Sequence, residues 1–548
     1  MTKLGFFGQT NKWTHDHSFA ISYTGHIDSY LQLERWTRRK YDNRLPDFLT
    51  DLVLPLGLDF SQTEIGYANT FALGDRFFKQ SDNDIHGKNI EISHEGTRQL
   101  KPISVTGKLN GEEREFIAVP HEIAHIFSSI PFYGLFRDNS LLVHIDGAAS
   151  ICNASAWLWK NGKLELLESS SILHHTLLNF SYNDVSFDIL NIPKAHHFSM
   201  PGKLMGFASF GSYHEKFHMW LQQNDFFRDY ANKSMEKMLS EANQQFGYNI
   251  TSIKQKHDFS FNFAYAVQYE FTSRLFNFIR KHQEATGSKF LYYSGGAALN
   301  IKLNSYLVNS QIFEDIYVPP PSGDSGLSLG VVSYLNWQDN IYQTKTEGQP
   351  YLNTYGLKVE NTAPTFSPDE VARDLVDNKI VGIFTGAAEA GPRALGHRSL
   401  LAIPSDKKLG EKLSRQIKGR EWYRPIAPVL LETETEYFFE NYTSSPITEY
   451  MLYDFKVRSN RLNEIPAVVH IDETARAQVV KTDNKDLKIL ISILETLRDR
   501  FGVHCLINTS FNSAGEPIVH TAEDARRSAR KMGVDKLIIN DTYEEVSL

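Results

Sequence analysis

Short apolar runs alternate with amphipathic stretches along the first half of the chain, and this alternation predicts an α/β fold. Residues 3–7, 141–145 and 290–293 are the clearest predicted strands. Each of these strands ends in a turn that carries polar or glycine residues. Because ligands bind at the carboxyl ends of strands in open α/β sheets, these turns are candidate parts of a binding site.

The second half follows a stretch with little periodicity, residues 337–364, which is rich in Asn, Thr, Gln and Gly and therefore contains the predicted linker. A helix over 369–377 and strands over 380–384 and 503–507 then predict another α/β unit. The length of 548 residues is compatible with two large domains. The predicted parts are residues 1–345, a linker over 346–366 and residues 367–548.

Composition excludes several classes of protein. The chain has 57 Lys and Arg against 65 Asp and Glu, so its net charge of −8 provides no global attraction to nucleic acid. Cys152 and Cys505 lie far apart in apolar surroundings, which argues against a disulfide framework or a cysteine-based metal site. No apolar run is long enough to span a membrane and the N-terminus has no signal-peptide core, so we expect a cytoplasmic protein. The sequence does not indicate the oligomeric state.

The first candidate for chemistry is the pattern His121-Glu122-Ile-Ala-His125. On a helix, His121 and His125 share one face and can bind one metal ion, with Asp146 and Asp324 as further oxygen ligands. This donor set suits iron, manganese or zinc without separating them. The same pattern also fits a zinc metalloprotease in which Glu122 activates water. The alternative without a metal is that one or both histidines only pack in the protein interior or cap a helix.

Several glycine turns are candidates for nucleotide binding. Gly295 and Gly296 stand between a predicted strand and a helix near Asn300, where backbone N–H groups can approach a phosphate. The turns at Asp146–Gly147 and Gly202–Lys203 are weaker signals of the same kind. Each could be a plain tight turn, but together they are compatible with one nucleotide site.

The C-terminal half carries the sharper phosphate signal. Arg393, His397 and Arg398 lie in a loop rich in glycine, and further cations follow beside Gly, Pro and strand ends. Guanidinium and ammonium groups suit a small, doubly charged phosphate ligand. A solvated basic face is the alternative for any one of them. The further candidates are Lys418, Arg420, Arg424, Arg476, Asn508 and Ser510.

These motifs occur in a specific order along the chain. In the first half they are residues 15–18, 34–40, the His121/His125 pair and 294–300, and in the second half residues 389–399, 422–428 and 508–512. With this set the sequence resembles, over essentially its whole length, the O-carbamoyltransferases of natural-product and nodulation-factor biosynthesis.

The resemblance implies a fold and a two-site reaction. The N-terminal domain would have the two-lobed actin/Hsp70/sugar-kinase architecture, with two ribonuclease-H-like lobes, and would be similar to the tRNA threonylcarbamoyl-transfer enzyme. The C-terminal domain would be YrdC-like, similar to the threonylcarbamoyl-adenylate synthase. Carbamoyl phosphate and ATP, with Mg(II), would give a carbamoyl-adenylate there. The N-terminal domain would then transfer the carbamoyl group to a hydroxyl of a natural-product or sugar-like acceptor.

The resemblance also implies residue roles. The metal, iron(II) in the family, would be held by His121, His125, Asp146 and Asp324. His15 and Lys40 would contact the transferred group, and Gly295, Gly296 and Asn300 the nucleotide. Carbamoyl phosphate and the intermediate would be bound by Arg393, Lys418, Arg424, Arg476, Asn508 and Ser510.

The chain departs from the family pattern at three places. Glu122 stands where the family commonly has histidine, Pro201 where it usually has glutamate, and Ala149 where it usually has glycine. A regulatory protein with inherited but inactive sites is a further hypothesis, which the intact charged residues oppose. A threonylcarbamoyl role on tRNA is another, which the net acidity weakens. The acceptor is compatible with an aminosugar, a polyketide, a toxin alkaloid or a lipid-linked sugar.

Overall fold

A computed structural model describes most of the chain. The described residues are 1–8, 14–69, 76–80, 83–86, 100–147, 149–150, 152–171, 198–223, 235–251, 257–342, 350–357, 364–440 and 442–547. Parts of the predicted linker, residues 346–349 and 358–363, therefore lie outside the described residues. Within these ranges, no helix combines the length and the apolarity that crossing a bilayer requires.

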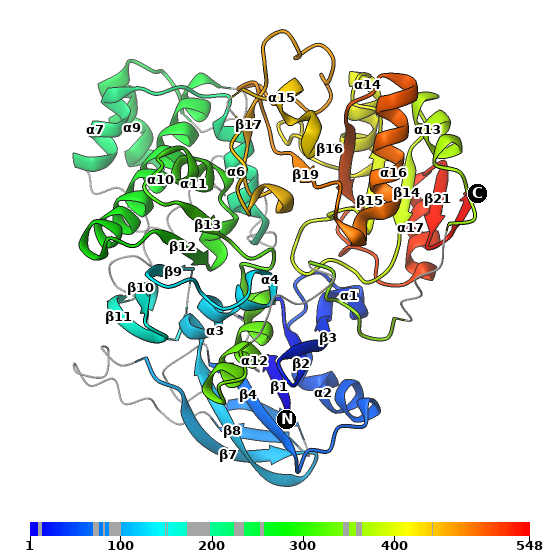
Figure 1. Ribbon diagram of the computed structural model, residues 1–548. Helices are drawn as coiled ribbons and strands as arrows, with labels where there is room; N and C mark the ends of the chain where they lie inside the picture. The colour runs from blue at the N-terminus through cyan, green and yellow to red at the C-terminus, as the bar shows by residue number, and fades with distance from the viewer. Residues whose placement is uncertain are drawn as a thin grey trace.

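The first sheet, in blue at the bottom of Figure 1, has the strand order β3-β2-β1-β4-β8-β7-β6-β5. Strands β1 to β3 form an antiparallel meander, whereas β4 is parallel to β1 and β8 is parallel to β4. The strands are β1 (Thr2–Phe7), β2 (Ser18–Tyr23), β3 (His26–Gln32), β4 (Thr63–Asn69), β5 (Arg76–Gln80), β6 (Asn83–His86), β7 (Ile103–Leu109) and β8 (Glu112–Pro120).

The second sheet repeats this arrangement with five strands in the order β11-β10-β9-β12-β13. Its first three strands form an antiparallel meander and the other two run parallel to β9. This order matches β3-β2-β1-β4-β8 of the first sheet, so the expected two-lobed N-terminal architecture is confirmed. The strands are β9 (Ser140–Ile145), β10 (Cys152–Lys160), β11 (Lys163–Ser171), β12 (Phe290–Ser294) and β13 (Asp315–Tyr317).

Two helices lie between the lobes, α3 (His121–Phe127) and α12 (Leu327–Gln338). They cross so closely that a Cβ on Gly330 of α12 would lie 1.7 Å from the carbonyl oxygen of Ala124. A larger residue than glycine cannot occupy this crossing without moving a backbone. The pair of helices thus fixes the position of α3, which carries both metal-candidate histidines.

The remaining helices cover the lobes. The long helix α10 packs its apolar face against the second sheet, where Phe263, Val267 and Ile279 are fully buried. Asn300 caps α11 because its side chain accepts a hydrogen bond from the Leu303 amide. The helices are α1 (Leu33–Thr37), α2 (Leu45–Val53), α4 (Ile130–Tyr133), α6 (Met200–Ala208), α7 (Glu215–Gln223), α9 (Met235–Phe246), α10 (Asp258–Thr286) and α11 (Ile301–Asn309).

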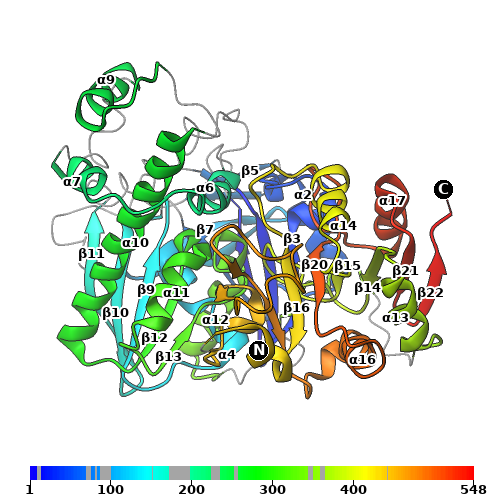
Figure 2. The same cartoon turned by 90° about the horizontal axis from the view of Figure 1, so that it is seen from above.

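The third sheet belongs to the second half of the chain and lies across the molecule from the second sheet (Figure 2). Its seven strands have the order β19-β16-β20-β15-β14-β21-β22. Helices flank this sheet, so the expected α/β class is confirmed, whereas the closer likeness to a YrdC-like domain stays a prediction. The strands are β14 (Val381–Phe384), β15 (Arg398–Ala402), β16 (Ala427–Leu431), β19 (Gln478–Val480), β20 (Leu506–Ser510), β21 (Lys536–Ile539) and β22 (Thr542–Glu545).

Helix ends in this half follow from local sequence signals. Ser367 caps α13, and Thr521 and Asp524 form a capping box at the start of α17. The helices are α13 (Pro368–Val376), α14 (Lys407–Glu411), α15 (Thr435–Phe438), α16 (Lys488–Thr496) and α17 (Ala522–Met532), and a small ladder pairs β17 (Phe455–Lys456) with β18 (Thr474–Ala475).

One predicted strand was placed wrongly. We expected it over 503–507 with Asn508 and Ser510 in a following turn, but β20 runs over Leu506–Ser510. Asn508 and Ser510 therefore lie within the ladder, where Ser510 pairs with Ser399. The polar side chain of Asn508 does not end the strand because its amide donates to the Gln478 side chain at 2.7 Å.

The segment that joins the two halves is packed between them. Tyr351, Leu352 and Asn353 are buried. The backbone of Asn353 pairs with Tyr30 of β3 on one side and with Ala388 on the other. The described part of the connection, residues 350–357, is thus held by both halves, and the exact domain boundaries stay a prediction.

Candidate functional site

The predicted metal ligands come together at the carboxyl ends of strands. His121 begins α3 directly after β8, and His125 lies one turn later, with ring centroids 4.6 Å apart. Asp146 follows β9, and Asp324 begins a short 3-10 turn over Asp324–Gly326. The predicted helix over the two histidines is therefore confirmed, and the structure brings all four predicted ligands together.

The distances between these donors fit one divalent cation. Nε2 of His125 lies 3.2 Å from Oδ2 of Asp146, and Oδ1 of Asp324 lies 3.5 Å from Nε2 of each histidine. Neighbouring ligands about 2.1 Å from one cation lie about 3.0–3.4 Å from each other. Both histidines are fully buried. Imidazole nitrogens and carboxylate oxygens in such a site suit iron(II), manganese or zinc.

Charges at this site are strongly coupled. Burial disfavours the charged form of His125, but hydrogen bonds with Asp146 and Asp324 raise the pKa of His125 to about 9. Burial and the charge of His125 lower the pKa of His121 well below its ordinary value. Protons and a divalent cation compete for these same donor atoms.

A third buried histidine, His144, joins the cluster. It lies on β9 two residues before Asp146, on the same face of the strand, and is fully buried. Donor atoms of His121, His125, His144 and Asp146 all lie within 4.8 Å of one another. Burial lowers the pKa of His144 to about 3. His144 was not among the predicted ligands, although the period of two from Asp146 could have identified it.

Glu122 does not fit the role of a catalytic base. Its carboxylate accepts hydrogen bonds from the backbone N–H of Cys152 at 3.1 Å and from the hydroxyl of Ser150. Because these bonds hold the turn between β9 and β10, the carboxylate is engaged by the fold. The zinc-protease alternative is therefore not supported.

The glycine turns close around Asp146. The amides of Gly147 and Gly296 both donate to its carboxylate, the second at 2.7 Å. Gly295 has φ +97°, and a Cβ there would lie 2.1 Å from the carbonyl oxygen of Ile145. These glycines thus join the ends of β9 and β12, and their expected contact with a nucleotide stays a prediction. The same holds for Asn300, whose amide pairs with Gln268.

His15 lies beside the metal cluster. Its Nδ1 is 2.9 Å from Oδ2 of Asp16, its Nε2 is 3.9 Å from Oδ2 of Asp324, and its ring packs on Phe198. Burial disfavours the charged imidazole, but the hydrogen bond to Asp16 and the charge of Asp324 raise the pKa of His15 to about 9. Asp16, which the sequence analysis did not select, thus orients the ring.

A cluster of five cations occupies the C-terminal half. Burial and the charge of Arg424 lower the pKa of Arg393 to about 10 and that of Arg420 to about 9. Burial and the charge of Arg393 lower the pKa of Arg476 well below its ordinary value. These shifts show that the cations lie close enough to repel one another. The members of this basic cluster are Arg393, Lys418, Arg420, Arg424 and Arg476.

The basic cluster has donors ready for an anion. The Nε atoms of Arg393 and Arg476 are buried and have no hydrogen-bond acceptor among the described residues. Lys418 donates to the carbonyl oxygens of Ser510 and Asn512, both at 2.6 Å. A bound phosphate would satisfy the free guanidinium donors and relieve the repulsion.

Side chains of the first half reach this cluster. Lys203 of α6 lies 2.8 Å from Oε1 of Glu421, and Oε2 of Glu421 lies 3.2 Å from Arg424. Burial lowers the pKa of Lys40, and the charges of Arg424 and Lys203 act in the same direction, whereas that of Glu34 opposes them. Lys203, expected at the nucleotide turns, thus lies beside the basic cluster.

Tyr41 connects the two regions. The centroid of its ring lies 6.4 Å from that of the His15 ring. Burial raises the pKa of Tyr41, whereas the charges of Arg424 and Arg393 act in the opposite direction. The line of side chains therefore runs from the basic cluster through Lys40 and Tyr41 to His15 and the metal cluster.

Two basic residues of the 389–399 loop serve the fold. His397 places both ring nitrogens near backbone carbonyls, those of Ala387 at 2.7 Å and Asp486 at 2.9 Å. Arg398 is fully buried and donates to the carbonyls of Thr385 and Gly386. Neither residue belongs to the basic cluster as defined above, and contact of either with a ligand stays a prediction.

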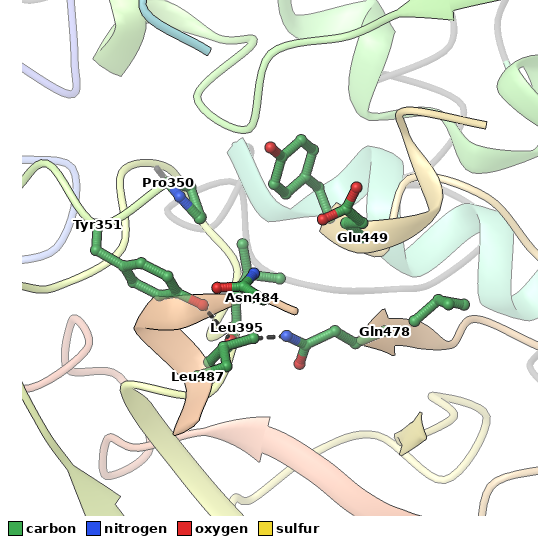
Figure 3. A pocket seen from close by; sticks show the side chains of 9 residues that line it. Pro350, Tyr351, Leu395, Glu449, Gln478, Asn484 and Leu487 are labelled. Carbon is green, nitrogen blue, oxygen red and sulfur yellow. Dashed lines mark hydrogen bonds between the residues drawn. The ribbon is translucent and has the colours of Figure 1, made fainter. Parts of the chain in front are cut away.

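Glu389 organises the same loop, because its Oε1 accepts from the amides of Leu395, His397 and Arg398. The carbonyl of Leu395 accepts from the Tyr351 hydroxyl at 2.8 Å and from the Gln478 amide at 2.7 Å (Figure 3). A cavity of about 10 Å³ beside these groups has room for one water molecule. These hydrogen bonds thus fix the loop that carries Arg393.

The 34–40 motif docks onto the C-terminal half. Arg35 donates to the carbonyl of Gly391 at 2.7 Å. Arg38 donates to the carbonyls of Pro517 and Ile518 at 2.8 and 2.6 Å. The motif therefore places Lys40 and Tyr41 at the junction of the halves, a role that the sequence analysis missed.

Two family models match the chain. The model for the carbamoyltransferase N-terminus matches residues 97–332, and the model for the carbamoyltransferase C-terminus matches residues 372–545. Fold, site and matches define an enzyme that transfers a carbamoyl group. The chain belongs to the carbamoyltransferase family.

Several known proteins are similar. Nodulation protein NolNO of Sinorhizobium fredii is 26% identical, covering 96% of this chain and 78% of that protein. Nodulation protein U of Bradyrhizobium diazoefficiens is 36% identical over 43% of this chain and 41% of that protein. A crystal structure of full-length HypF, in the phosphate- and nucleotide-bound form, covers 61% of this chain and 55% of that chain, with 13% identity and a TM-score of 0.33.

Proposed function

We propose that this carbamoyltransferase is an ATP-dependent O-carbamoyltransferase that works through carbamoyl-adenylate. The observation that carries the proposal is the line of side chains from the basic cluster through Lys40 and Tyr41 to His15 and the metal cluster. An activating site and a transfer site that share one junction suit an intermediate made in one half and used in the other.

The first step takes place at the basic cluster. Water hydrolyses carbamoyl phosphate to carbamate and inorganic phosphate, and a carbamate oxygen then attacks the α-phosphate of ATP and releases pyrophosphate. Carbamate itself is a poor electrophile because its carbonyl is conjugated with nitrogen and with O⁻. Bonding to AMP turns one oxygen into a good leaving group. Arg393, Lys418 and Arg424 bind the phosphate groups, since paired guanidinium donors match phosphate oxygens.

The second step takes place at the metal cluster. A hydroxyl of the acceptor attacks the carbamoyl carbon and AMP leaves. His15 either takes the hydroxyl proton, a contribution on the order of 10²–10⁴-fold that requires its neutral form, or binds the phosphate group as the imidazolium that its pKa of about 9 favours at neutral pH. Asp16 holds the ring of His15, and Lys40 binds the carbamoyl-adenylate phosphate. The bound metal, iron(II) or another divalent ion, supplies Lewis acidity.

The cofactors of the proposal are ATP with Mg(II), and its acceptor is a natural-product or sugar-like alcohol, as in antibiotic biosynthesis and other secondary metabolism. The boundaries are residues 1–345 for transfer, 346–366 for the linker and 367–548 for a YrdC-like activating domain. The proposed setting is the cytoplasm, because both cysteines are buried free thiols.

The test separates the two half-reactions. Arg424→Ala or Lys418→Ala should abolish pyrophosphate release that depends on carbamoyl phosphate and ATP, while AMP release from supplied carbamoyl-adenylate continues. His121→Ala should do the reverse. If both kinds of substitution abolish the same half-reaction, the assignment to two sites is wrong.

A further inference from the structure

His144 lies beside the predicted metal ligands although the family resemblance gives it no role. In the sheet it pairs with Ser155 of β10 on one side and with Ser294 of β12 on the other. Its ring stacks on that of His125 at 5.1 Å with an interplanar angle of 23°, and lies 6.1 Å from the ring of His121. The imidazole therefore faces the same space as both predicted ligands.

The Nε2 atom of His144 is buried and has no hydrogen-bond partner within the described part of the chain. A buried polar atom without a hydrogen-bond partner is unfavourable, because it has lost its water without gaining a replacement. Its donor atom belongs to a group in which donor atoms of His121, His125, His144 and Asp146 all lie within 4.8 Å of one another. Asp324 is not part of that group and adjoins it through the Nε2 atoms of His121 and His125, each at 3.5 Å. A bound cation would supply the missing partner.

The other ring nitrogen has the support that metal-binding histidines usually have. Nδ1 of His144 lies 3.5 Å from the hydroxyl oxygen of Ser155, which also accepts from the indole N–H of Trp157 at 3.0 Å. With a proton on Nδ1 directed at Ser155, the lone pair of Nε2 faces the cluster. Such a hydrogen bond fixes both the tautomer and the orientation of a ligand histidine.

We propose that His144 is a fifth protein ligand of the metal, beside His121, His125, Asp146 and Asp324. This inference rests on the proposed function for the presence of a metal. Three imidazoles and two carboxylates favour iron(II), cobalt(II) or zinc over Mg(II) and Ca(II), which prefer oxygen ligands.

The test measures metal binding directly on the full-length chain. Metal-free wild type, His144→Ala and Ser155→Ala are titrated with Co(II), whose visible absorption reports its ligands. We expect His144→Ala to weaken Co(II) binding about 100-fold and to shift the absorption bands, and Ser155→Ala to weaken it about 10-fold. His520→Ala removes an equally buried histidine from the C-terminal half and should leave Co(II) binding unchanged.

Co(II) binding by His144→Ala with wild-type affinity and spectrum overturns the proposal. His144→Gln keeps a polar side chain of similar length, so it provides the same measurement if the alanine variant does not fold. Pyrophosphate release is measured on the same samples. If wild type releases none, the proposed function fails, but a cobalt spectrum that changes with His144 still supports the ligand assignment.

Discussion

Lys418 combines two opposing influences on one ammonium group. The carbonyl oxygens of Ser510 and Asn512 accept hydrogen bonds from its ammonium group, both at 2.6 Å, which favours the charged form. Burial and the neighbouring charge of Arg420 nevertheless lower the pKa of Lys418 well below its ordinary value. Since an incoming phosphate dianion would counter this repulsion, binding of phosphate and retention of the proton by Lys418 reinforce each other.

Glu122→Gln tests whether Glu122 acts structurally or as a base. The glutamine oxygen can still accept from the Cys152 amide, and its NH₂ group can donate to the hydroxyl of Ser150, so the turn is preserved. We expect AMP release from supplied carbamoyl-adenylate to stay within about tenfold of wild type, since no proton transfer by Glu122 is involved. Pyrophosphate release serves as the internal control and should not change.

A protease that used Glu122 as its base would behave in the opposite way. It would cleave an unfolded test protein such as casein, and the glutamine variant would lose that cleavage completely. If wild type hydrolyses casein and Glu122→Gln does not, the structural role assigned to Glu122 is wrong.

Residue types and spacing predicted part of the site. His121 and His125 could be recognised because a spacing of four places them on one helix face, and Asp146 and Asp324 were candidate oxygen ligands that the family resemblance supported. His144 and Glu421 were missed because their roles depend on sheet pairing and on contact between the halves. The sequence could not show that backbone carbonyls face the ring of His397, whose contact with a phosphate stays a prediction.

At the scale of elements, the crossing of α3 and α12 sets the position of the metal cluster. Ala124 lies between His121 and His125, and its carbonyl is the atom that α12 approaches at Gly330. Any increase in the distance between these helices moves both histidines relative to Asp324, which lies just before α12. The packing of α3 against α12 and the geometry of the metal site therefore depend on each other.

Gly330→Ala should damage both stability and metal binding. Its Cβ would overlap the Ala124 carbonyl, and overpacking of this kind costs about 1–3 kcal/mol of the free energy of unfolding. We expect a lower thermal midpoint and weaker Co(II) binding. Gly202→Ala in α6 is the matched control, because a Cβ there meets no atom within 4 Å. Equal behaviour of the two variants would show that the helix crossing does not control the site.

Strands with continuous apolar runs were predictable from the sequence to within one or two residues, as β1, β9 and β12 show. The start of strand β20 was not predictable in this way. The helical segment Leu497–Phe501 ends at Gly502, and the residues between Gly502 and Leu506 connect it to the strand without pairing in the sheet. Ladder partners decide where such a strand starts, and a single sequence contains no information on them.

At the scale of the whole molecule, an ion pair away from the chemistry fixes the two halves together. Lys302 of α11 lies 2.6 Å from Oδ2 of Asp454 and 2.8 Å from Oδ2 of Asp472. These contacts raise the pKa of Lys302, although burial opposes the shift. Burial raises the pKa of Asp472, but a hydrogen bond with His470 and the charge of Lys302 together lower it. A second contact joins Asn304 of α11 to the carbonyl of Leu452.

Lys302→Ala should uncouple the half-reactions. Without the ammonium, two carboxylates face each other at the junction, so the halves separate more readily. We expect pyrophosphate release to continue while the amount of carbamoyl-adenylate that escapes into solution, per pyrophosphate, rises several-fold. Lys281→Ala removes an exposed lysine of α10 and should not raise this ratio. An unchanged ratio in Lys302→Ala would mean that this ion pair does not govern transfer between the sites.

The connecting segment has a consequence for how the gene can be divided. The backbone of Asn353 pairs with Tyr30 and with Ala388 at the same time, so a chain break near Asn353 would separate strands that pair through it. Two separately expressed pieces would first have to find each other and rebuild this shared seam. When both halves are synthesised as one chain, they form this pairing without first having to associate by diffusion.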